Sequence, residues 1–313
     1  MKVSATTLFL AAALGVSAHP SGHAHKHLHR SMYLKAMRPN PSPLPAYSPP
    51  ETTASAVQYT ADPTPSPPEH EQLPPNSTSG PDDSDDNGLG LSTEQPLCPK
   101  KQKRDTTYAD IVTVGNTGGE DFGCNLQRIQ ASLAPHYPYT IKLINDGGKE
   151  QECACSLKKA KNGGPNSGTF KGGELFKFTL QPRKYQYLAA DPDTKGSCTC
   201  AAGTIPTNKY GQYANSWVEF DFASEVNGNE QVRQSGTDAS CLTSLDAQLG
   251  IQGMHVSRHG SSDAPSIICP GASKGSINSY YAKDLHSKGG IGLNMRTEPD
   301  EKICIVVHVD YQC

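Results

Sequence analysis

The chain has 313 residues and a net charge of −3; hydrophobic residues make up 35% of it, with 29 glycines and 25 prolines. This charge argues against nucleic acid or an anionic membrane as a partner. The low apolar content predicts a folded domain smaller than the whole chain, behind a segment that cannot form a core. Ten cysteines indicate an oxidising compartment.

The first 18 residues have the pattern of a secretory signal peptide. Lys2 supplies the positive start, residues 8–14 the apolar core, and residues 16–18 a small-residue cleavage site. The apolar run is too short to span a bilayer, and no other segment is long enough. We therefore expect a secreted, extracellular protein with no membrane anchor.

A histidine-rich run follows the signal peptide. Its imidazoles are ligands that Cu(II), Ni(II) or Zn(II) accept. Nothing in the run fixes a coordination geometry, so the favoured interpretation is a leader with pH-dependent charge and no cofactor. The residues concerned are His19, His23, His25, His27 and His29.

Residues 19–97 as a whole are predicted to be a disordered linker. Beyond the histidines they are rich in Pro, Ser and Thr and cannot bury a core. Asn76 lies in the only N-glycosylation sequon of the chain.

The Lys103-Arg104 pair is a potential processing site, but cleavage there would remove Cys98 and leave an odd number of cysteines. We therefore place the domain at 98–313.

The domain is predicted to be a disulfide-braced β-sandwich with minor helices. Short runs with period-two alternation end at turn residues, and helical patterns are scarce. The strands at 175–180 and 185–188 are expected to form a hairpin. Other strands are predicted at 139–144, 217–222 and 304–311, and helices at 125–133 and 277–285.

Two Cys-x-Cys pairs give the sharpest disulfide prediction. In a strand, each pair places both sulfurs on one face, so two pairs on neighbouring strands could form two stacked bridges or one four-thiolate zinc site. Bridges are favoured in a secreted protein. All ten cysteines are expected in disulfides, with the remaining connectivity open: Cys98, Cys124, Cys153, Cys155, Cys198, Cys200, Cys241, Cys269, Cys304 and Cys313.

The run from Trp217 to Phe222 carries the main candidate site. Alternation places Val218, Phe220 and Phe222 on one face and Trp217, Glu219 and Asp221 on the other. The two carboxylates, about 6.5–7 Å apart at Cα, could approach one sugar ring together. The alternative is the solvated face of a half-buried strand.

A G-x-S-x-G sequence at 271–275 suggests a serine hydrolase. Ser273, Asp284 and His308 occur in the order of an α/β-hydrolase triad. Pro270 lies where the preceding strand should enter the turn, and no parallel α/β pattern surrounds the motif. This interpretation is therefore disfavoured.

Several short sequence elements occur in order along the domain: Gly115-Asn116-x-Gly118 with Gly123-x-Asn125, the strand at 139–146, Trp217-x-Glu219-Phe220-Asp221-Phe222, Asp238-Ala239-Ser240, Gln252-Gly253-Met254, Ser266-Ile267-Ile268, Tyr281-x-x-Asp284-Leu285, Gly290-Ile291-Gly292 and Val309-Asp310-Tyr311. With these elements the domain resembles the Asp f four-like family of secreted fungal allergens. The resemblance implies a protein recognised by IgE.

A second, more distant similarity is carried by Val218-Glu219-Phe220, Asp238-Ala239-Ser240 and the stretch from Gly250 to Met254. In these elements the domain resembles thaumatin-like proteins, which are β-sandwiches with an acidic cleft used on β-glucans. The resemblance implies that Glu219 and Asp238 are cleft acids, with Asp246 as a third.

Three functions compete. The first is a non-catalytic binding domain for cell-wall polysaccharide, such as β-glucan, using Trp217, Glu219, Asp221, Asp238 and Asp246, with Tyr185 or Tyr187 as further stacking residues. The second is a weak β-1,3-glucanase with Glu219 and Asp238 as its catalytic pair. The third is a host-interacting effector or structural wall protein.

Overall fold

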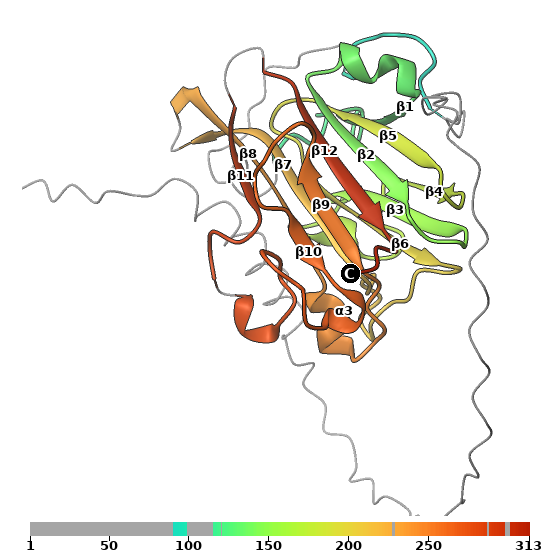
Figure 1. Ribbon diagram of the computed structural model, residues 1–313. Coiled ribbons are helices and arrows are strands. Elements are labelled where there is room, and N and C mark those ends of the chain that lie inside the picture. Colours follow the sequence, from blue (N-terminus) through green and yellow to red (C-terminus); the bar gives the residue numbers. More distant parts are fainter. Residues whose placement is uncertain (1–89, 99–114, 120, 227–228, 287, 298–300) are drawn as a thin grey trace, which may run out of the picture.

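The computed structural model describes residues 90–98, 115–119, 121–226, 229–286, 288–297 and 301–313. The signal peptide, the histidine run, Asn76 and the dibasic pair lie outside these residues. The described chain forms two sheets of six strands each that pack face to face (Figure 1). The prediction of an all-β sandwich is confirmed.

The first sheet, sheet A, has mixed strand directions. Its neighbours are antiparallel except for β2 and β12, which run parallel. In spatial order it contains β1 (Leu126–Ile129), β5 (Tyr185–Ala190), β2 (Tyr139–Asn145), β12 (Ile303–Val309), β9 (Met254–Arg258) and β10 (Ser266–Ile268).

The second sheet, sheet B, is antiparallel throughout. In spatial order it contains β11 (Leu293–Thr297), β8 (Asn229–Ser240), β7 (Trp217–Val226), β6 (Lys195–Ala202), β3 (Gln151–Leu157) and β4 (Phe176–Leu180).

Helical elements in the described chain are short. They are α3 (Leu242–Ala247) and the 3-10 turns η1 (Ala131–His136), η2 (Ser167–Thr169), η3 (Pro270–Ala272) and η4 (Lys283–Leu285). None of them is long and apolar enough to cross a membrane.

Alternation along the strands builds the core between the sheets. In β12, Ile303, Ile305, Val307 and Val309 are buried, while the residues between them are half-exposed. They pack with the inward residues of sheet B, among them Phe220. The period-two pattern thus assigns the core face correctly.

The stacked bridges are confirmed. Cys153 pairs with Cys200 and Cys155 with Cys198, because β3 and β6 are neighbours and place these residues directly opposite each other. Two further disulfides join Cys98 to Cys124 and Cys269 to Cys313. The expectation of a fifth bridge is wrong. Cys241 and Cys304 are free thiols.

Both helix predictions and the hairpin are wrong. Residues 126–129 pair with β5 as an edge strand, and Ile277 forms a β-bridge with Ile267. β4 and β5 belong to different sheets. Arg183 has a left-handed φ of 62° in the turn between them, where the chain passes from sheet B to sheet A.

Candidate functional site

At Trp217, Glu219 and Asp221, the outward face of β7 is covered and does not meet solvent. Trp217 is only 4% exposed, and its ring lies 6.5 Å from that of the buried Tyr213 in the loop between β6 and β7. Its indole Nε1 donates a hydrogen bond to Thr243 Oγ1 at 3.1 Å. The predicted side of the strand is therefore correct, but the predicted exposure of Trp217, Glu219 and Asp221 is wrong.

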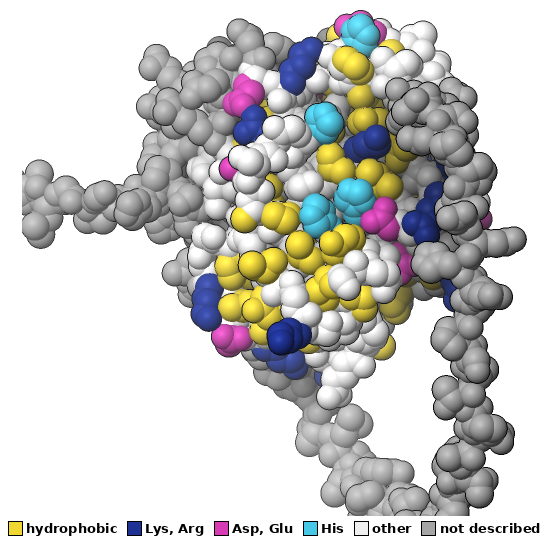
Figure 2. All heavy atoms as spheres, in the orientation of Figure 1, with side chains coloured by type: hydrophobic (Ala, Val, Ile, Leu, Met, Phe, Trp, Pro, Cys, Tyr) yellow, Lys and Arg dark blue, Asp and Glu magenta, His cyan; other side chains and the backbone are white. Residues whose placement is uncertain are grey.

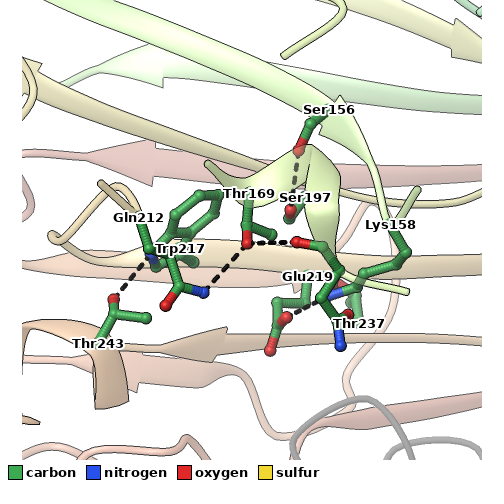
Figure 3. Close-up of polar contacts among 10 residues, drawn as sticks. Ser156, Lys158, Thr169, Ser197, Gln212, Trp217, Glu219, Thr237 and Thr243 are labelled. Carbon is green, nitrogen blue, oxygen red and sulfur yellow. Dashed lines mark hydrogen bonds and ion pairs between the residues drawn. The ribbon is translucent and has the colours of Figure 1, made fainter. Parts of the chain in front are cut away.

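Each of the two β7 carboxylates has a buried lysine as its partner. Glu219 contacts Lys158 Nζ, and the two side chains are 1% and 0% exposed (Figure 3). Asp221 Oδ2 lies 3.0 Å from Lys195 Nζ, again with both side chains buried. Sealed carboxylates of this kind require a countercharge, because transfer of an isolated charge from water costs several kcal/mol.

The buried side chains on the outward side of sheet B, among them Glu219 and Asp221, form what we call the covered layer. Asp238 belongs to this layer and lies on the neighbouring strand. It stands directly opposite Glu219 in the β7–β8 register and is fully buried. Gly292 crosses above it with a φ of +92°, where a Cβ would come within 2.6 Å of Asp238 Cβ. Burial raises the pKa of the Tyr280 phenol, and the charges of Asp238 and Glu219 raise it further. The phenol therefore lies in the field of both carboxylates.

Asp246 is not part of this layer. It is exposed on α3, and its Oδ1 lies 3.4 Å from Lys283 Nζ. The structure thus brings Glu219 and Asp238 together and leaves the third predicted acid on the surface.

Hydroxyl and amide groups complete the covered layer. The Ser156 and Ser197 hydroxyls lie within hydrogen-bonding distance at 3.4 Å (Figure 3). On the opposite face of sheet B, Thr237 stands opposite Phe220, and its Oγ1 donates to the backbone carbonyl of Glu219 at 2.9 Å. Gln212 Nε2 donates to Thr169 Oγ1 at 3.0 Å. Hydrogen bonds between buried groups restrain the side chains that make them.

The hydrolase motif does not assemble. His308 Nδ1 lies 3.0 Å from both carboxylate oxygens of Asp146, and Asp284 pairs with Lys288 at 3.2 Å. Ser273 is exposed and follows a 3-10 turn rather than a strand-to-helix elbow. Within the described ranges, no group of three or more potential ligands is placed to hold a metal ion.

A second surface lies on the other sheet. Tyr185 and Tyr187, which were expected to extend the Trp217 site, belong to β5 of sheet A, so their grouping with Trp217 is wrong. We call this second surface the outer face of sheet A. One row of this face crosses five strands in register, and all its members are half-exposed: Tyr185, Ile144, His308, His255 and Ile267. The row is roughly 19 Å long, since four intervals of about 4.8 Å separate five strands. Figure 2 shows hydrophobic and histidine side chains gathered over this part of the molecule.

The tyrosine end of this face carries a cation. The rings of Tyr185 and Tyr187 lie 5.7 Å apart, edge to face. Lys142 Nζ is 4.3 Å from the centre of the Tyr185 ring and 5.5 Å from that of Tyr187. The contact restrains the lysine and both rings.

The histidine end forms a compact polar cluster. The His255 and His308 rings are 5.4 Å apart, and the Tyr311 ring lies 5.2 Å from His255. Burial lowers the pKa of His255, and the charge on His308 lowers it further; Asp146 acts in the opposite direction. In the sequence, alternation within each strand was the signal that could have indicated this outer face. The strands pair with partners far away in the sequence, so alternation alone does not show that these residues are neighbours.

The two sheets, the covered layer of sheet B and the outer face of sheet A define a cystine-braced, all-β protein with buried carboxylates and an amphipathic surface. The chain belongs to the Asp f 4-like allergen family, because the model of the Allergen Asp f 4-like domain matches residues 124–307. The sequence resemblance to this family is confirmed.

A curated relative supports this assignment. Allergen Asp f 4 of Aspergillus fumigatus is 27% identical over 203 residues, which cover 64% of this chain and 59% of that protein. The chain therefore aligns with less than two thirds of that relative's length.

Two solved structures show weaker likeness. The protein elicitor MoHrip2 from Magnaporthe oryzae has a TM-score of 0.31 at 9% identity, over 55% of this chain and 99% of its own. The thaumatin-like xylanase inhibitor TLXI has a TM-score of 0.27 at 12% identity, over 54% of this chain and 97% of its own. At these TM-scores the likeness carries no argument about function.

Proposed function

We propose that this chain is a secreted, non-catalytic protein that binds cell-wall polysaccharide through the outer face of sheet A. The observation that carries the proposal is the cross-strand row from Tyr185 to Ile267, in which half-exposed aromatic and aliphatic side chains follow one another across five strands.

The chemistry of this face suits a carbohydrate. Sugar rings stack their C–H groups on aromatic faces, and their hydroxyls need donors and acceptors at the edges. Tyr185 and Tyr187 supply rings, and Lys142 supplies a donor between them. His308 adds a polar group within the row, and Asp146 adds an acceptor beside it. The face therefore combines stacking with polar recognition.

The buried carboxylates support neither binding nor hydrolysis in this structure. A general acid must reach the glycosidic oxygen within hydrogen-bond distance, and a binding carboxylate must reach a hydroxyl. Glu219 and Asp238 are 1% and 0% exposed. A β-1,3-glucanase would need this layer to open, and we therefore place the ligand on sheet A.

A pull-down on insoluble β-1,3-glucan, with chitin in parallel, tests the proposal. The wild-type protein should sediment with one of these polymers, and the Tyr185→Ala/Tyr187→Ala variant should lose most of this binding. Tyr210→Ala is the matched control, because Tyr210 is 49% exposed and also lies beside a lysine, at 5.1 Å from Lys209 Nζ. Equal binding by all three proteins, or no binding by any, would reject the proposal.

Catalysis is measured in the same samples. We expect no release of reducing ends above that of heat-denatured protein. Release that disappears in Glu219→Gln would instead establish the glucanase and contradict the non-catalytic role.

We also propose that the chain is extracellular, wall-associated and recognised by IgE. Four disulfides are typical of an oxidising compartment, and the family relative is named as an allergen. Cell fractionation would test the location, and immunoassay with sera from patients sensitised to that relative would test IgE recognition. Retention inside the cell, or absent serum reactivity, would contradict these points.

A further inference from the structure

Three buried ionisable side chains lie at adjacent positions in the covered layer of sheet B. Lys158 follows β3, Glu219 lies on β7 and Asp238 on β8, and their exposed fractions are 0%, 1% and 0%. Lys158 Nζ contacts Glu219 Oε1, and Asp238 stands directly opposite Glu219. The amine and the Glu219 carboxyl are thus in contact away from water. Directly opposite residues on neighbouring antiparallel strands have Cβ atoms about 4.5–5.5 Å apart, which places the Asp238 carboxyl beside that of Glu219.

We propose that Lys158 and Glu219 become joined by an intramolecular amide bond, with Asp238 carrying the proton between them. The bond would tie the end of β3 to β7 across the intervening β6. This inference is independent of polysaccharide binding, which uses the other sheet.

The reaction balances as a simple dehydration. A proton leaves the Lys158 ammonium for a carboxylate, and the neutral amine nitrogen attacks Glu219 Cδ to form the C–N bond. One C–O bond of that carboxyl then breaks, and the oxygen leaves as water with two hydrogens from the original ammonium. Asp238 accepts and returns one of these protons and is unchanged at the end. No electrons are transferred, so the step needs no oxidant or cofactor.

The environment favours the neutral product. In water an ammonium and a carboxylate are stabilised by hydration, which opposes condensation. In a buried site both ions lose that hydration. Replacing a buried ion pair by well-packed apolar side chains often leaves stability unchanged or raises it, so the charged state has little net advantage there. Holding the two groups in contact also removes the entropic cost of a bimolecular encounter. The water released leaves the layer, and its exclusion protects the amide.

The neighbouring ion pair provides a comparison inside the same layer. Lys195 and Asp221 are also buried and 3.0 Å apart. On β8, however, the residue opposite Asp221 is Gly236, which has no carboxyl group to carry a proton. We therefore expect the amide at Lys158 and an ordinary ion pair at Lys195.

Peptide mapping of the full secreted chain tests for the amide between Lys158 and Glu219 without any variant. After reduction, alkylation and deglycosylation, tandem mass spectrometry should find the Lys158 peptide linked to the Glu219 peptide, with one water less than their sum. Reduction separates disulfide partners, so the remaining link identifies the amide. Two unlinked peptides from correctly folded wild-type protein would overturn the proposal.

Variants test the assigned roles. Lys158→Arg keeps the positive charge but removes the amine and should abolish the link. Asp238→Asn should reduce the linked fraction at least tenfold, while Lys195→Arg should leave it unchanged. Circular dichroism checks that each variant is folded. Full linkage in folded Lys158→Arg, or unchanged linkage in Asp238→Asn, would contradict the assignment of nucleophile or proton carrier respectively.

Discussion

Lys158 contacts Glu219 at a point where neither side chain reaches solvent. An arrangement of this kind is weak evidence of a stability gain, since desolvation of both groups opposes their attraction. Removing one partner is different, because the other is left buried without compensation. The pair therefore constrains which substitutions the covered layer tolerates.

The Lys158→Met variant is expected to lower the free energy of unfolding by about 3–5 kcal/mol, because the Glu219 carboxyl then lacks its cation. The loss follows whether the wild-type pair is ionic or joined by an amide. Urea unfolding followed by circular dichroism measures it. Lys177→Met is the control, since Lys177 and Glu152 form a partly exposed pair, and such pairs contribute about 0.2–1 kcal/mol. Equal losses in both variants would contradict the buried role.

Alternation within a strand was enough to predict the two faces of β7 and the stacking of the Cys-x-Cys pairs. Each depends on the period-two geometry of a single segment. What covers a face depends on distant segments. The loop with Tyr213 and the turn with Gly292 close over Trp217 and Asp238. A tryptophan beside two carboxylates looks like a surface group in sequence, and only the packed loops show otherwise.

The outer face of sheet A could not be predicted from the sequence for a related reason. Its row joins residues from Ile144 to His308 that become neighbours only through strand pairing. The helix predicted at 125–133 failed because residues 126–129 pair with β5 at the sheet edge, and such tertiary pairing overrides a local helical pattern.

The stacked disulfides should respond non-additively to removal. Cys153–Cys200 and Cys155–Cys198 close nested loops with sequence separations of 47 and 43. Replacing all four cysteines by alanine is expected to cost about 3–5 kcal/mol of unfolding free energy. Replacing only the outer pair should cost far less, because the inner bridge still restricts almost the same loop. Urea unfolding of the two variants checks this, and two equal losses would contradict the nested-loop explanation.

The free thiols give a chemical test of the four-bridge pattern. Denaturation without reductant should allow iodoacetamide to label two cysteines, Cys241 and Cys304. In the native protein Cys241 should resist labelling at pH 8, because burial raises its pKa to about 12 and blocks access. Burial also raises the pKa of the half-buried Cys304, so its reaction should be slow.

Labelling sites are identified by peptide mass spectrometry, and a fully reduced sample labelled at all ten cysteines is the control. Absence of any label in denatured, unreduced protein would show a fifth bridge and contradict the structure.

His255 should make stability fall in mildly acidic solution. Its pKa in the folded protein is lowered, first by burial and then by His308. As the pH drops through about 6.5, the usual histidine pKa, the unfolded chain therefore binds a proton that the folded chain resists. The free energy of unfolding decreases in this window and levels off once the pH lies below the folded pKa. Urea unfolding between pH 7.5 and about 5 measures the slope.

The His255→Gln variant should have a shallower slope in that window, because it removes the group whose proton uptake differs between the two states. His259→Gln is the control, since His259 is exposed just beyond the end of the same strand. Carboxylates that titrate at the acidic end contribute equally to all three proteins, so the comparison isolates the histidine. Identical slopes for wild type and His255→Gln would show that the pKa of His255 does not differ between the folded and unfolded states. The pH dependence would then have to arise from other groups.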